Sequence, residues 1–101
     1  ANVVRFRIDD KLKHKVPHIG WNTAHVHRSS PLWKELSNES MFYFVHSYHL
    51  ICHNKEDVLT TSDYEYSFVS AIQKDNMYGT QFHPEKSYSW GEELFKNFVE
   101  I

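Results

Sequence analysis

One proline separates a histidine from a glutamate in His83-Pro84-Glu85, the stretch of this chain with the clearest capacity for chemistry. A histidine that acts as a general base needs one ring nitrogen free and the other held, and a nearby carboxylate can hold it while stabilising the imidazolium. Side chains two residues apart point to one side of an extended backbone, and Pro84 favours an extended His83. The pattern predicts a stiff corner in which Glu85 orients His83. The same spacing also fits an exposed turn with an incidental ion pair.

This corner lies between a predicted strand and a predicted helix. The apolar run 77–82 is typical of a short strand leading into His83, and such strand ends are where α/β proteins usually keep their chemistry. Ser89 and Glu92 then match a capping box, which predicts that a helix begins there. The side of this helix expected to pack on the sheet carries Leu94, Phe95, Phe98 and Val99.

The first half of the chain is predicted to contain two extended segments, a loop and a short helix. Alternation places Val4, Phe6 and Ile8 on one side of a half-buried strand at 3–8, and a second extended segment covers 16–21. Residues 23–30 are polar and indicate a loop. Ser30-Pro31 is typical of an N-cap followed by proline at the first helical position, so we expect a short helix with Leu32, Trp33 and Leu36 on its apolar side.

The second half is predicted to be mainly strands. The segment 41–51 is the strongest of them, because it is rich in aromatic and β-branched residues. A strand at 58–61, a turn at 62–65 and a strand at 66–72 follow. Since short turns separate these strands, they must pair antiparallel.

Polar residues interrupt the segment 41–51 at His46, Ser47 and His49. Polar groups in an otherwise buried strand need hydrogen-bond partners, or they face a functional site. The alternative is that they alternate outward to water. The sequence leaves both possibilities open.

Composition excludes several classes of function. The chain has 101 residues, 41% of them hydrophobic, so it is at most one small domain. The net charge of −2 favours neither nucleic acid nor an anionic membrane as a partner, and no apolar run approaches membrane-spanning length. Cys52 is the single cysteine, so no internal disulfide forms, and a reducing cytoplasmic setting is expected. No glycine-rich phosphate loop is present.

Eight histidines raise the question of a metal site. No acidic or cysteine partner lies at a recognisable ligand spacing from them, so we expect neither a metal nor a cofactor. Apart from His83, they form two groups: His14, His18, His25 and His27, then His46, His49 and His53.

The chain also has the character of a piece of a larger body. Aromatic residues make up 16% of it, while it contains three glycines and begins with a strand-like run that lacks a methionine. So many large apolar side chains require more surface to pack against than a chain this short provides.

Three stretches together resemble the class I (triad) glutamine amidotransferases. They are Val16-Pro17-His18-Ile19-Gly20-Trp21-Asn22, Phe42-Tyr43-Phe44-Val45-His46-Ser47-Tyr48 and Tyr78-Gly79-Thr80-Gln81-Phe82-His83-Pro84-Glu85-Lys86-Ser87. Gln-Phe-His-Pro-Glu is shared by the whole class. Pro-His-Ile-Gly-Trp-Asn and Phe-Val-His-Ser-Tyr are most similar to the glutaminase subunits of imidazole glycerol phosphate synthases. The resemblance covers nearly all of 1–101.

The resemblance implies an α/β fold, namely the C-terminal half of a flavodoxin-like three-layer domain with largely antiparallel or mixed strands and a C-terminal helix. The half that carries the nucleophile would be absent. A half-domain exposes a sheet edge, so self-association through that edge is expected unless the chain belongs to a larger body.

The resemblance also implies a Cys-His-Glu triad that hydrolyses glutamine and passes ammonia to a (β/α)₈ cyclase subunit in a heterodimer. By motif, His83 is the base and Glu85 its orienting partner. The segment that would bind glutamine contains His46, Ser47 and Tyr48. The surface that would meet the cyclase, where ammonia crosses, contains Trp21, Tyr43 and Lys86.

This chain departs from the family at the nucleophile. The family's cysteine lies on a Gly-x-Cys-x-Gly elbow, whereas Cys52 follows a predicted strand with no elbow glycines. We therefore expect Cys52 to be a spectator and the isolated chain to lack glutaminase activity. Two alternatives remain: a paralogue that donates ammonia for surface-polysaccharide sugar modification, and a non-catalytic interaction module that would not need an aligned His83 and Glu85.

Overall fold

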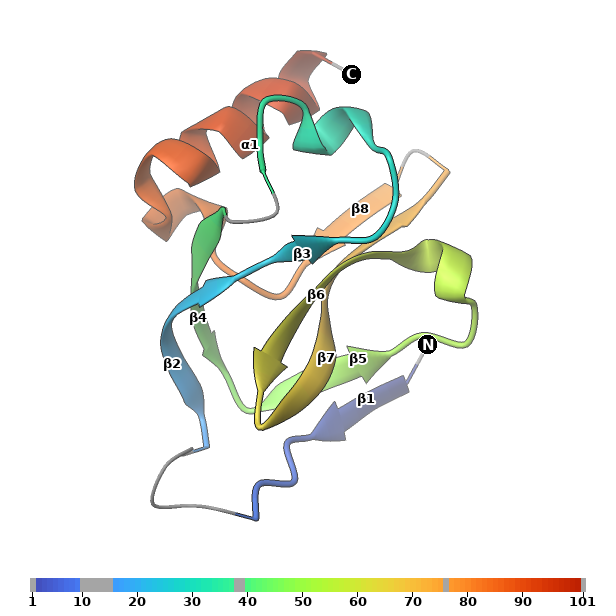
Figure 1. The fold of residues 1–101 in the computed structure, drawn as a ribbon, viewed down its shortest axis with the longest axis vertical. Helices are drawn as coiled ribbons and strands as arrows, with labels where there is room; N and C mark the ends of the chain where they lie inside the picture. The colour runs from blue at the N-terminus through green and yellow to red at the C-terminus, as the bar shows by residue number, and fades with distance from the viewer. Residues whose placement is uncertain (1, 10–15, 38–39, 76, 101) are drawn as a thin grey trace.

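The computed structural model describes residues 2–9, 16–37, 40–75 and 77–100. These residues form two antiparallel sheets and a C-terminal helix, so the expected mixture of mainly strands and a last helix is confirmed (Figure 1). The larger sheet has the strand order β1-β5-β7-β6-β3, with β8 also paired to β7. Its strands are β1 (Asn2–Arg5), β3 (His25–Val26), β5 (Tyr48–Ile51), β6 (Val58–Tyr64), β7 (Tyr66–Lys74) and β8 (Met77–Thr80).

The smaller sheet pairs β2 (His18–Thr23) with β4 (Met41–His46). Strands β4 and β5 follow each other directly, so the single strand predicted over 41–51 is wrong: it bends at Ser47 and passes from one sheet into the other. The burial pattern shows the change. Phe42, Phe44 and His46 alternate inward, but the next buried residue is His49, three positions later.

Two other predicted segments differ from the structure. The predicted loop 23–30 contains the short strand β3, which pairs with Thr60 and Thr61. Residues 62–64 of the predicted turn 62–65 belong to β6, and Glu65 alone reverses the chain between β6 and β7, with a φ of 68°. Both differences arise because pairing with a neighbouring strand extends segments whose own residues are polar.

The short helix predicted after Ser30 is a 3₁₀ helix, η1 (Pro31–Trp33). The Ser30 side-chain oxygen accepts a hydrogen bond from the Leu32 N–H at 3.2 Å, which confirms the N-cap. Leu32 and Trp33 are buried.

Helix α1 (Tyr88–Glu100) begins one residue before the predicted cap. Ser89 lies inside the helix, and the Gly91 N–H donates to the carbonyl of Ser87 at 3.2 Å, so Ser87 precedes the first turn. The capping-box prediction is therefore wrong in position.

The side of α1 that packs inward also differs from the prediction. Its buried residues are Gly91, Leu94 and Asn97, whereas Phe95, Phe98 and Val99 are exposed. The amide of Asn97 donates to the carbonyls of Leu32 (2.9 Å) and Lys34 (2.6 Å), which turns this side of the helix toward η1. Of the predicted packing residues, Leu94 alone is buried.

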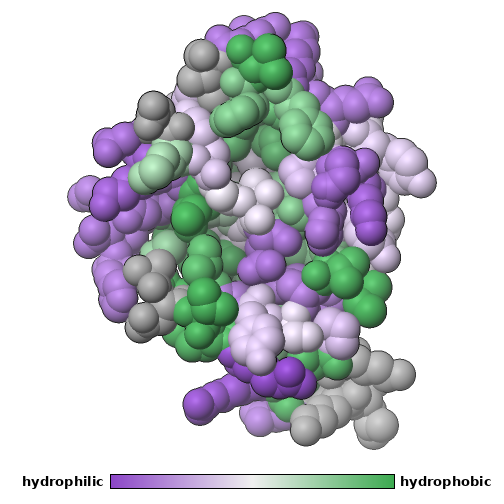
Figure 2. Space-filling model, turned by 180° about the vertical axis from the view of Figure 1, so that it is seen from behind, coloured by the Kyte–Doolittle hydropathy of each residue, from purple (hydrophilic) through white to green (hydrophobic). Residues whose placement is uncertain are grey.

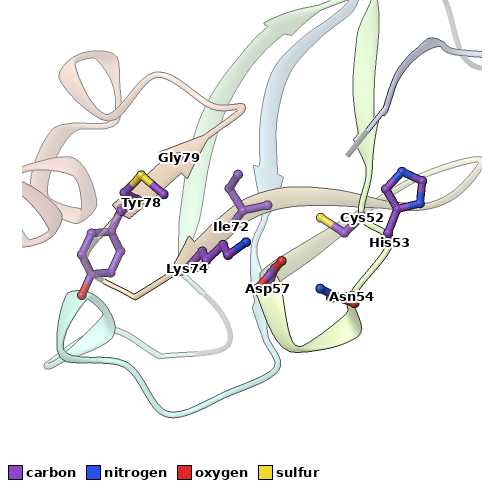
Figure 3. Close-up of a pocket in the computed structure, with 9 residues that line it drawn as sticks. Cys52, His53, Asn54, Asp57, Ile72, Lys74, Tyr78 and Gly79 are labelled. Atoms are coloured by element: carbon purple, nitrogen blue, oxygen red, sulfur yellow. The ribbon is translucent and has the colours of Figure 1, made fainter.

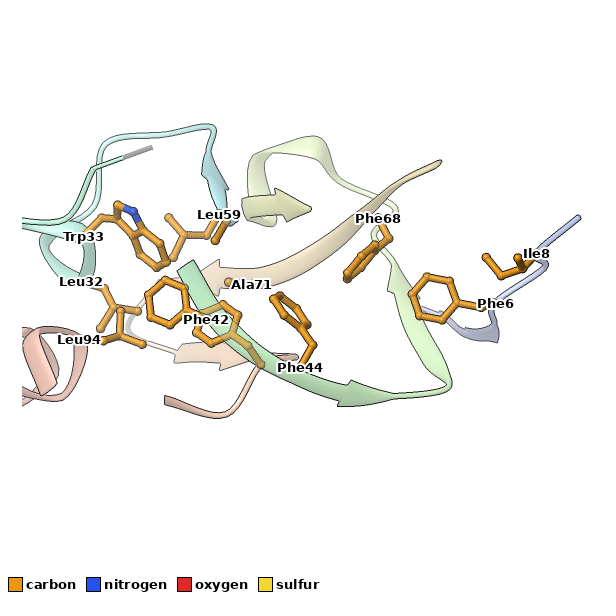
Figure 4. Close-up of a cluster of buried hydrophobic side chains, with 12 residues drawn as sticks. Phe6, Ile8, Leu32, Trp33, Phe42, Phe44, Leu59, Phe68, Ala71 and Leu94 are labelled. Carbon is orange, nitrogen blue, oxygen red and sulfur yellow. The ribbon is translucent and has the colours of Figure 1, made fainter. Parts of the chain in front are cut away.

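The hydrophobic core lies between the two sheets and extends to α1 (Figure 4). Aromatic rings fill most of it: Phe42 stacks on Phe82 with ring centroids 4.2 Å apart, and Phe44 lies 5.9 Å from Phe68. Figure 4 shows Phe6 and Ile8 at one end and Leu94 at the other. The predicted inward positions of the first strand are thus confirmed, although β1 ends at Arg5.

Many large apolar side chains remain on the surface. Figure 2 shows them on one face as several separate hydrophobic patches among hydrophilic residues. The most exposed are Val3, Ile19, Met77, Tyr88, Phe98 and Val99. Among the described residues, no helix combines the length and apolar character needed to cross a membrane.

Candidate active site

The side chains of His83 and Glu85 are in contact, as the sequence predicts. The Nδ1 of His83 and the Oε1 of Glu85 are 2.9 Å apart, and both side chains are about half exposed. An ionised carboxylate can only accept, so Nδ1 carries the hydrogen and the neutral ring keeps its lone pair on Nε2. Within the described residues, no protein group bonds Nε2. The ring is thus arranged to take a proton at Nε2 while Glu85 stabilises the resulting imidazolium.

Strand β4 holds the backbone of this corner. The His83 N–H donates to the Tyr43 carbonyl at 2.9 Å, which makes an isolated antiparallel bridge. The fully buried hydroxyl of Ser87 accepts from the Tyr43 N–H (3.0 Å) and donates to the His83 carbonyl (2.7 Å). A single hydroxyl therefore ties β4 to both ends of the 3₁₀ helix η3 (Pro84–Lys86).

Helix α1 packs closely against the His83-Pro84-Glu85 corner at Gly91. A Cβ atom built at this position would collide with the carbonyl oxygen of Pro84. The first turn of α1 can approach η3 this closely because residue 91 has no side chain. The corner is thereby held between β4 and α1.

The bend at Ser47 contains the residues that the sequence places in a glutamine-binding segment. The Ser47 carbonyl accepts from the Phe6 N–H at 3.0 Å, and the Tyr48 carbonyl accepts from the His46 ring nitrogen Nδ1 at 2.8 Å. The side chain of Tyr48 is half exposed, whereas His46 is buried. The alternative that the polar residues of 41–51 face water is wrong for His46 and His49, since both rings point into the core.

The buried histidines form a directed chain of hydrogen bonds. Because His46 donates from Nδ1 to a carbonyl, its Nε2 accepts, and the partner at 3.0 Å is Nδ1 of His18. The Nε2 of His18 then accepts from the Asn22 amide at 3.5 Å. Nearby, His49 Nε2 lies 2.8 Å from the Tyr66 hydroxyl. The sequence predicted neither the hydrogen bond between His18 and His46 nor the burial of the two rings, because the residues lie 28 positions apart.

Burial lowers the pKa of His46 from its ordinary value of 6.5, and the nearby His49 and His83 act in the same direction, while the hydrogen bond to Tyr48 opposes them. The folded protein therefore keeps this ring neutral where the unfolded chain protonates it.

This pKa shift predicts a loss of stability on acidification. The unfolded chain takes up the proton first, so the free energy of unfolding begins to fall below about pH 6.5 and continues to fall until the pH reaches the folded pKa. Urea unfolding at about pH 8 and about pH 5.5, above the range of ordinary carboxylates, measures the difference. His46→Asn should lose less of its free energy of unfolding between these two pH values than the wild-type protein. An equal loss in both proteins would show that other titrating groups cause the pH dependence.

Cys52 lies away from the corner. It is half-buried, carries a free thiol and lines a cavity of about 400 Å³ with His53, Asn54, Asp57 and Lys74 among others, and neither His83 nor Glu85 lines it. Figure 3 shows the Cys52 sulfur directed toward Ile72, on the opposite side of the cavity from Tyr78. Burial, and secondarily the charge of Asp57, raise the pKa of this thiol, which disfavours the nucleophilic thiolate.

The three residues predicted to meet a partner lie together. Trp21, Tyr43 and Lys86 line one surface hollow with Tyr88, which the sequence reasoning did not select. The Trp21 ring stacks on Tyr88 with centroids 5.7 Å apart and meets Tyr43 edge-on at 6.0 Å. Tyr88 could have been suspected because it directly follows the stretch 78–87 that carries the family resemblance.

The predicted histidine groups do not form a metal centre in the described part of the chain. No cluster of three or more His, Cys, Asp or Glu side chains there is arranged to hold an ion. His25 contacts Asp63 at 3.7 Å on the surface. His14 lies outside the described residues.

Comparison with known proteins gives consistent results. The model of the family "Glutamine amidotransferase class-I" matches residues 2–101. The chain is 46% identical over 99 residues to the imidazole glycerol phosphate synthase subunit HisH 2 of Methanococcus maripaludis, covering 98% of this chain and 48% of that protein. It is 42% identical over 101 residues to subunit HisH 1 of Campylobacter jejuni RM1221, covering 100% and 49%.

Similarity in fold extends to a solved structure. The crystal structure of a Thermoplasma acidophilum protein described as a GMP synthase component superposes with a TM-score of 0.74 at 23% identity, covering 98% of this chain and 47% of that one. The chain thus spans about half the length of the curated relatives it matches. Because the family model matches residues 2–101, the chain belongs to the class I glutamine amidotransferase family.

Proposed function

We propose that this chain is part of a cytoplasmic glutaminase that supplies ammonia from glutamine to a (β/α)₈ cyclase, within a heterodimeric imidazole glycerol phosphate synthase of histidine biosynthesis. The observation that carries the proposal is the 2.9 Å contact between Nδ1 of His83 and Oε1 of Glu85, with no partner for Nε2 among the described residues. An interaction module would not need this alignment. The relatives, which are subunits of imidazole glycerol phosphate synthases, support the choice of synthase.

In this proposal, residues 1–101 are the C-terminal half of a flavodoxin-like three-layer domain, and the nucleophilic cysteine lies in the remainder of the protein. The relatives are about twice as long as this chain, which leaves room for it. The exposed apolar side chains, such as Phe98 and Val99, are then candidates for burial against that remainder, and self-association through a sheet edge would arise when it is missing.

The proposed reaction uses His83 twice. Its Nε2 takes the proton of the cysteine thiol as the sulfur attacks the amide carbon of glutamine. The imidazolium, stabilised by Glu85, returns that proton to the amide nitrogen as ammonia leaves and a thioester forms. Water, deprotonated by the same nitrogen, then hydrolyses the thioester to glutamate and regenerates the thiol.

Two other surfaces have roles in this proposal. The backbone of Ser47 and Tyr48 binds glutamine, with His46 in the same segment. The hollow lined by Trp21, Tyr43 and Lys86 faces the cyclase where ammonia crosses. Tryptophan and tyrosine are enriched at the well-packed centres of protein interfaces, which supports this role for Trp21 and Tyr43.

A paralogue that donates ammonia to another synthase is the second candidate. Methanococcus maripaludis has two curated HisH subunits, and this chain is 46% identical to one and 45% identical to the other. The glutaminase chemistry would be unchanged, and only the partner would differ.

Complementation separates the two candidates. The full-length gene is expected to restore growth without histidine to a strain that lacks its own glutaminase subunit, and Cys52→Ser should restore it equally because Cys52 lies outside the corner. The purified complex should release glutamate, whereas the 101-residue chain alone should release none. Glutamate release without complementation would favour the other synthase, and Cys52-dependent release by the isolated chain would overturn the assignment of the nucleophile.

A further inference from the structure

We propose that His46, held in turn by His18, is a positioning residue that fixes the backbone at Ser47 and Tyr48 for binding glutamine. This inference rests on the proposed function and deepens it, because it assigns His46 a role behind the binding surface instead of contact with the substrate. The ring is buried and bonds protein groups at both nitrogens.

The hydrogen bonds at the bend determine where its peptide planes face. In a trans peptide, the C=O of one residue and the N–H of the next point in opposite directions. The Phe6 N–H holds the Ser47 carbonyl, so the Tyr48 N–H points to the other side. His46 holds the Tyr48 carbonyl, which sets the following peptide in the same way. The carbonyls of two successive peptide planes, those that follow Ser47 and Tyr48, are therefore each held by a hydrogen bond.

The bend needs this support because no ladder runs through it: the β2–β4 ladder ends with His18 paired to His46, and the β1–β5 ladder ends with Arg5 paired to Tyr48. Ser47 lies between β4 and β5, which belong to different sheets. Backbone between two sheets loses the regular hydrogen bonds that fix peptide planes within a strand. The His46 side chain, which lies at the end of β4, provides a replacement bond to the first residue of β5.

The ring of His46 cannot easily rotate away from this bond. His18 donates to its Nε2 at 3.0 Å, and His18 itself lies between Phe44 and Tyr64, with ring centroids 5.0 and 4.1 Å away. Phe6 and Phe68 contact the His46 ring at 5.0 and 5.2 Å. Flipping the ring would break both hydrogen bonds in an apolar environment, which is unfavourable.

Histidine isosteres separate this role from packing. An asparagine amide nitrogen occupies nearly the position of Nδ1, so His46→Asn can still donate to the Tyr48 carbonyl. A glutamine amide occupies nearly the position of Nε2, so His46→Gln can still accept from His18 but leaves that carbonyl without its donor. Phe68→Leu is the matched packing control, because it removes a ring contact to His46 and no hydrogen bond.

The test is steady-state glutamine hydrolysis by the full-length protein in complex with its cyclase, together with the melting temperature of each variant. We expect His46→Gln to raise KM for glutamine roughly tenfold, the loss that one hydrogen bond to a binding segment produces, with kcat nearly unchanged. His46→Asn should remain within about threefold of wild type. Phe68→Leu should lower the melting temperature without raising KM.

A second pair of variants guards against misfolding at position 46. His18→Asn retains a donor toward His46, whereas His18→Gln removes it, so the same order of KM values is expected with smaller differences. Equal KM values for the Asn and Gln variants at both positions, or KM values that follow the melting temperature as in Phe68→Leu, would overturn the positioning role. Lack of glutamate release by the wild-type complex would instead overturn the proposed function, and this inference with it.

Discussion

Replacing His83 with alanine in the full-length protein is expected to lower kcat for glutamine hydrolysis by about 10³-fold or more, with KM nearly unchanged. The ring holds its hydrogen toward Glu85, 2.9 Å away, and its Nε2 is the proposed proton acceptor. Without it, the thiol would have to lose its proton to water. Glutamate release by the purified complex measures the effect.

Glu85→Gln should lower kcat less than His83→Ala, by about 10- to 100-fold. The amide oxygen can still accept from Nδ1, but the negative charge that stabilises the imidazolium is lost. Glu92→Gln is the matched control, because it removes an exposed carboxylate from the first turns of α1. If His83→Ala retained kcat within about threefold of wild type, His83 would not be the base, and the interaction-module alternative would become the better explanation.

Gly91→Ala is expected to destabilise the protein by about 1–3 kcal/mol and to lower kcat by about 10²-fold. In an open helix, this change would stabilise by about 1 kcal/mol, because alanine has the higher helix propensity. Here the added Cβ would collide with the Pro84 carbonyl, a backbone atom that cannot rotate aside. Either α1 moves outward or the corner that contains His83 moves.

Ser89→Ala is the control for this second prediction, since Ser89 is exposed in the same turn of the helix and should tolerate the change. Urea unfolding measures stability, and glutamate release measures activity. A stabilised and fully active Gly91→Ala protein would show that the helix and the corner separate without cost, so that α1 does not hold the corner.

The contact between His83 and Glu85, the proposed catalytic pair, could be predicted from the sequence because its geometry is local. His83 and Glu85 are two residues apart, and Pro84 restricts the backbone between them, so few arrangements are possible. The N-cap at Ser30 and the antiparallel pairing of β6 with β7 and of β7 with β8 were predictable for the same reason. The same rule was wrong for β5, which pairs with β7 and not with β6, the strand that follows it in the chain. Hydrophobic alternation likewise placed Phe6 and Ile8 in the core before any contact was known.

The features that position this pair arise from residues far apart in the chain, and only the tertiary structure could decide them. The Ser87 hydroxyl reaches Tyr43 across 44 positions, and His18 meets His46 across 28. The hydrogen bonds of Asn97 to η1 turn the Asn97 side of α1 inward. The apolar pattern of the sequence had instead predicted that Phe98 and Val99 would be buried. Local preferences set how each segment folds, whereas the burial of polar groups and the orientation of elements depend on which partners the whole fold brings within hydrogen-bond distance.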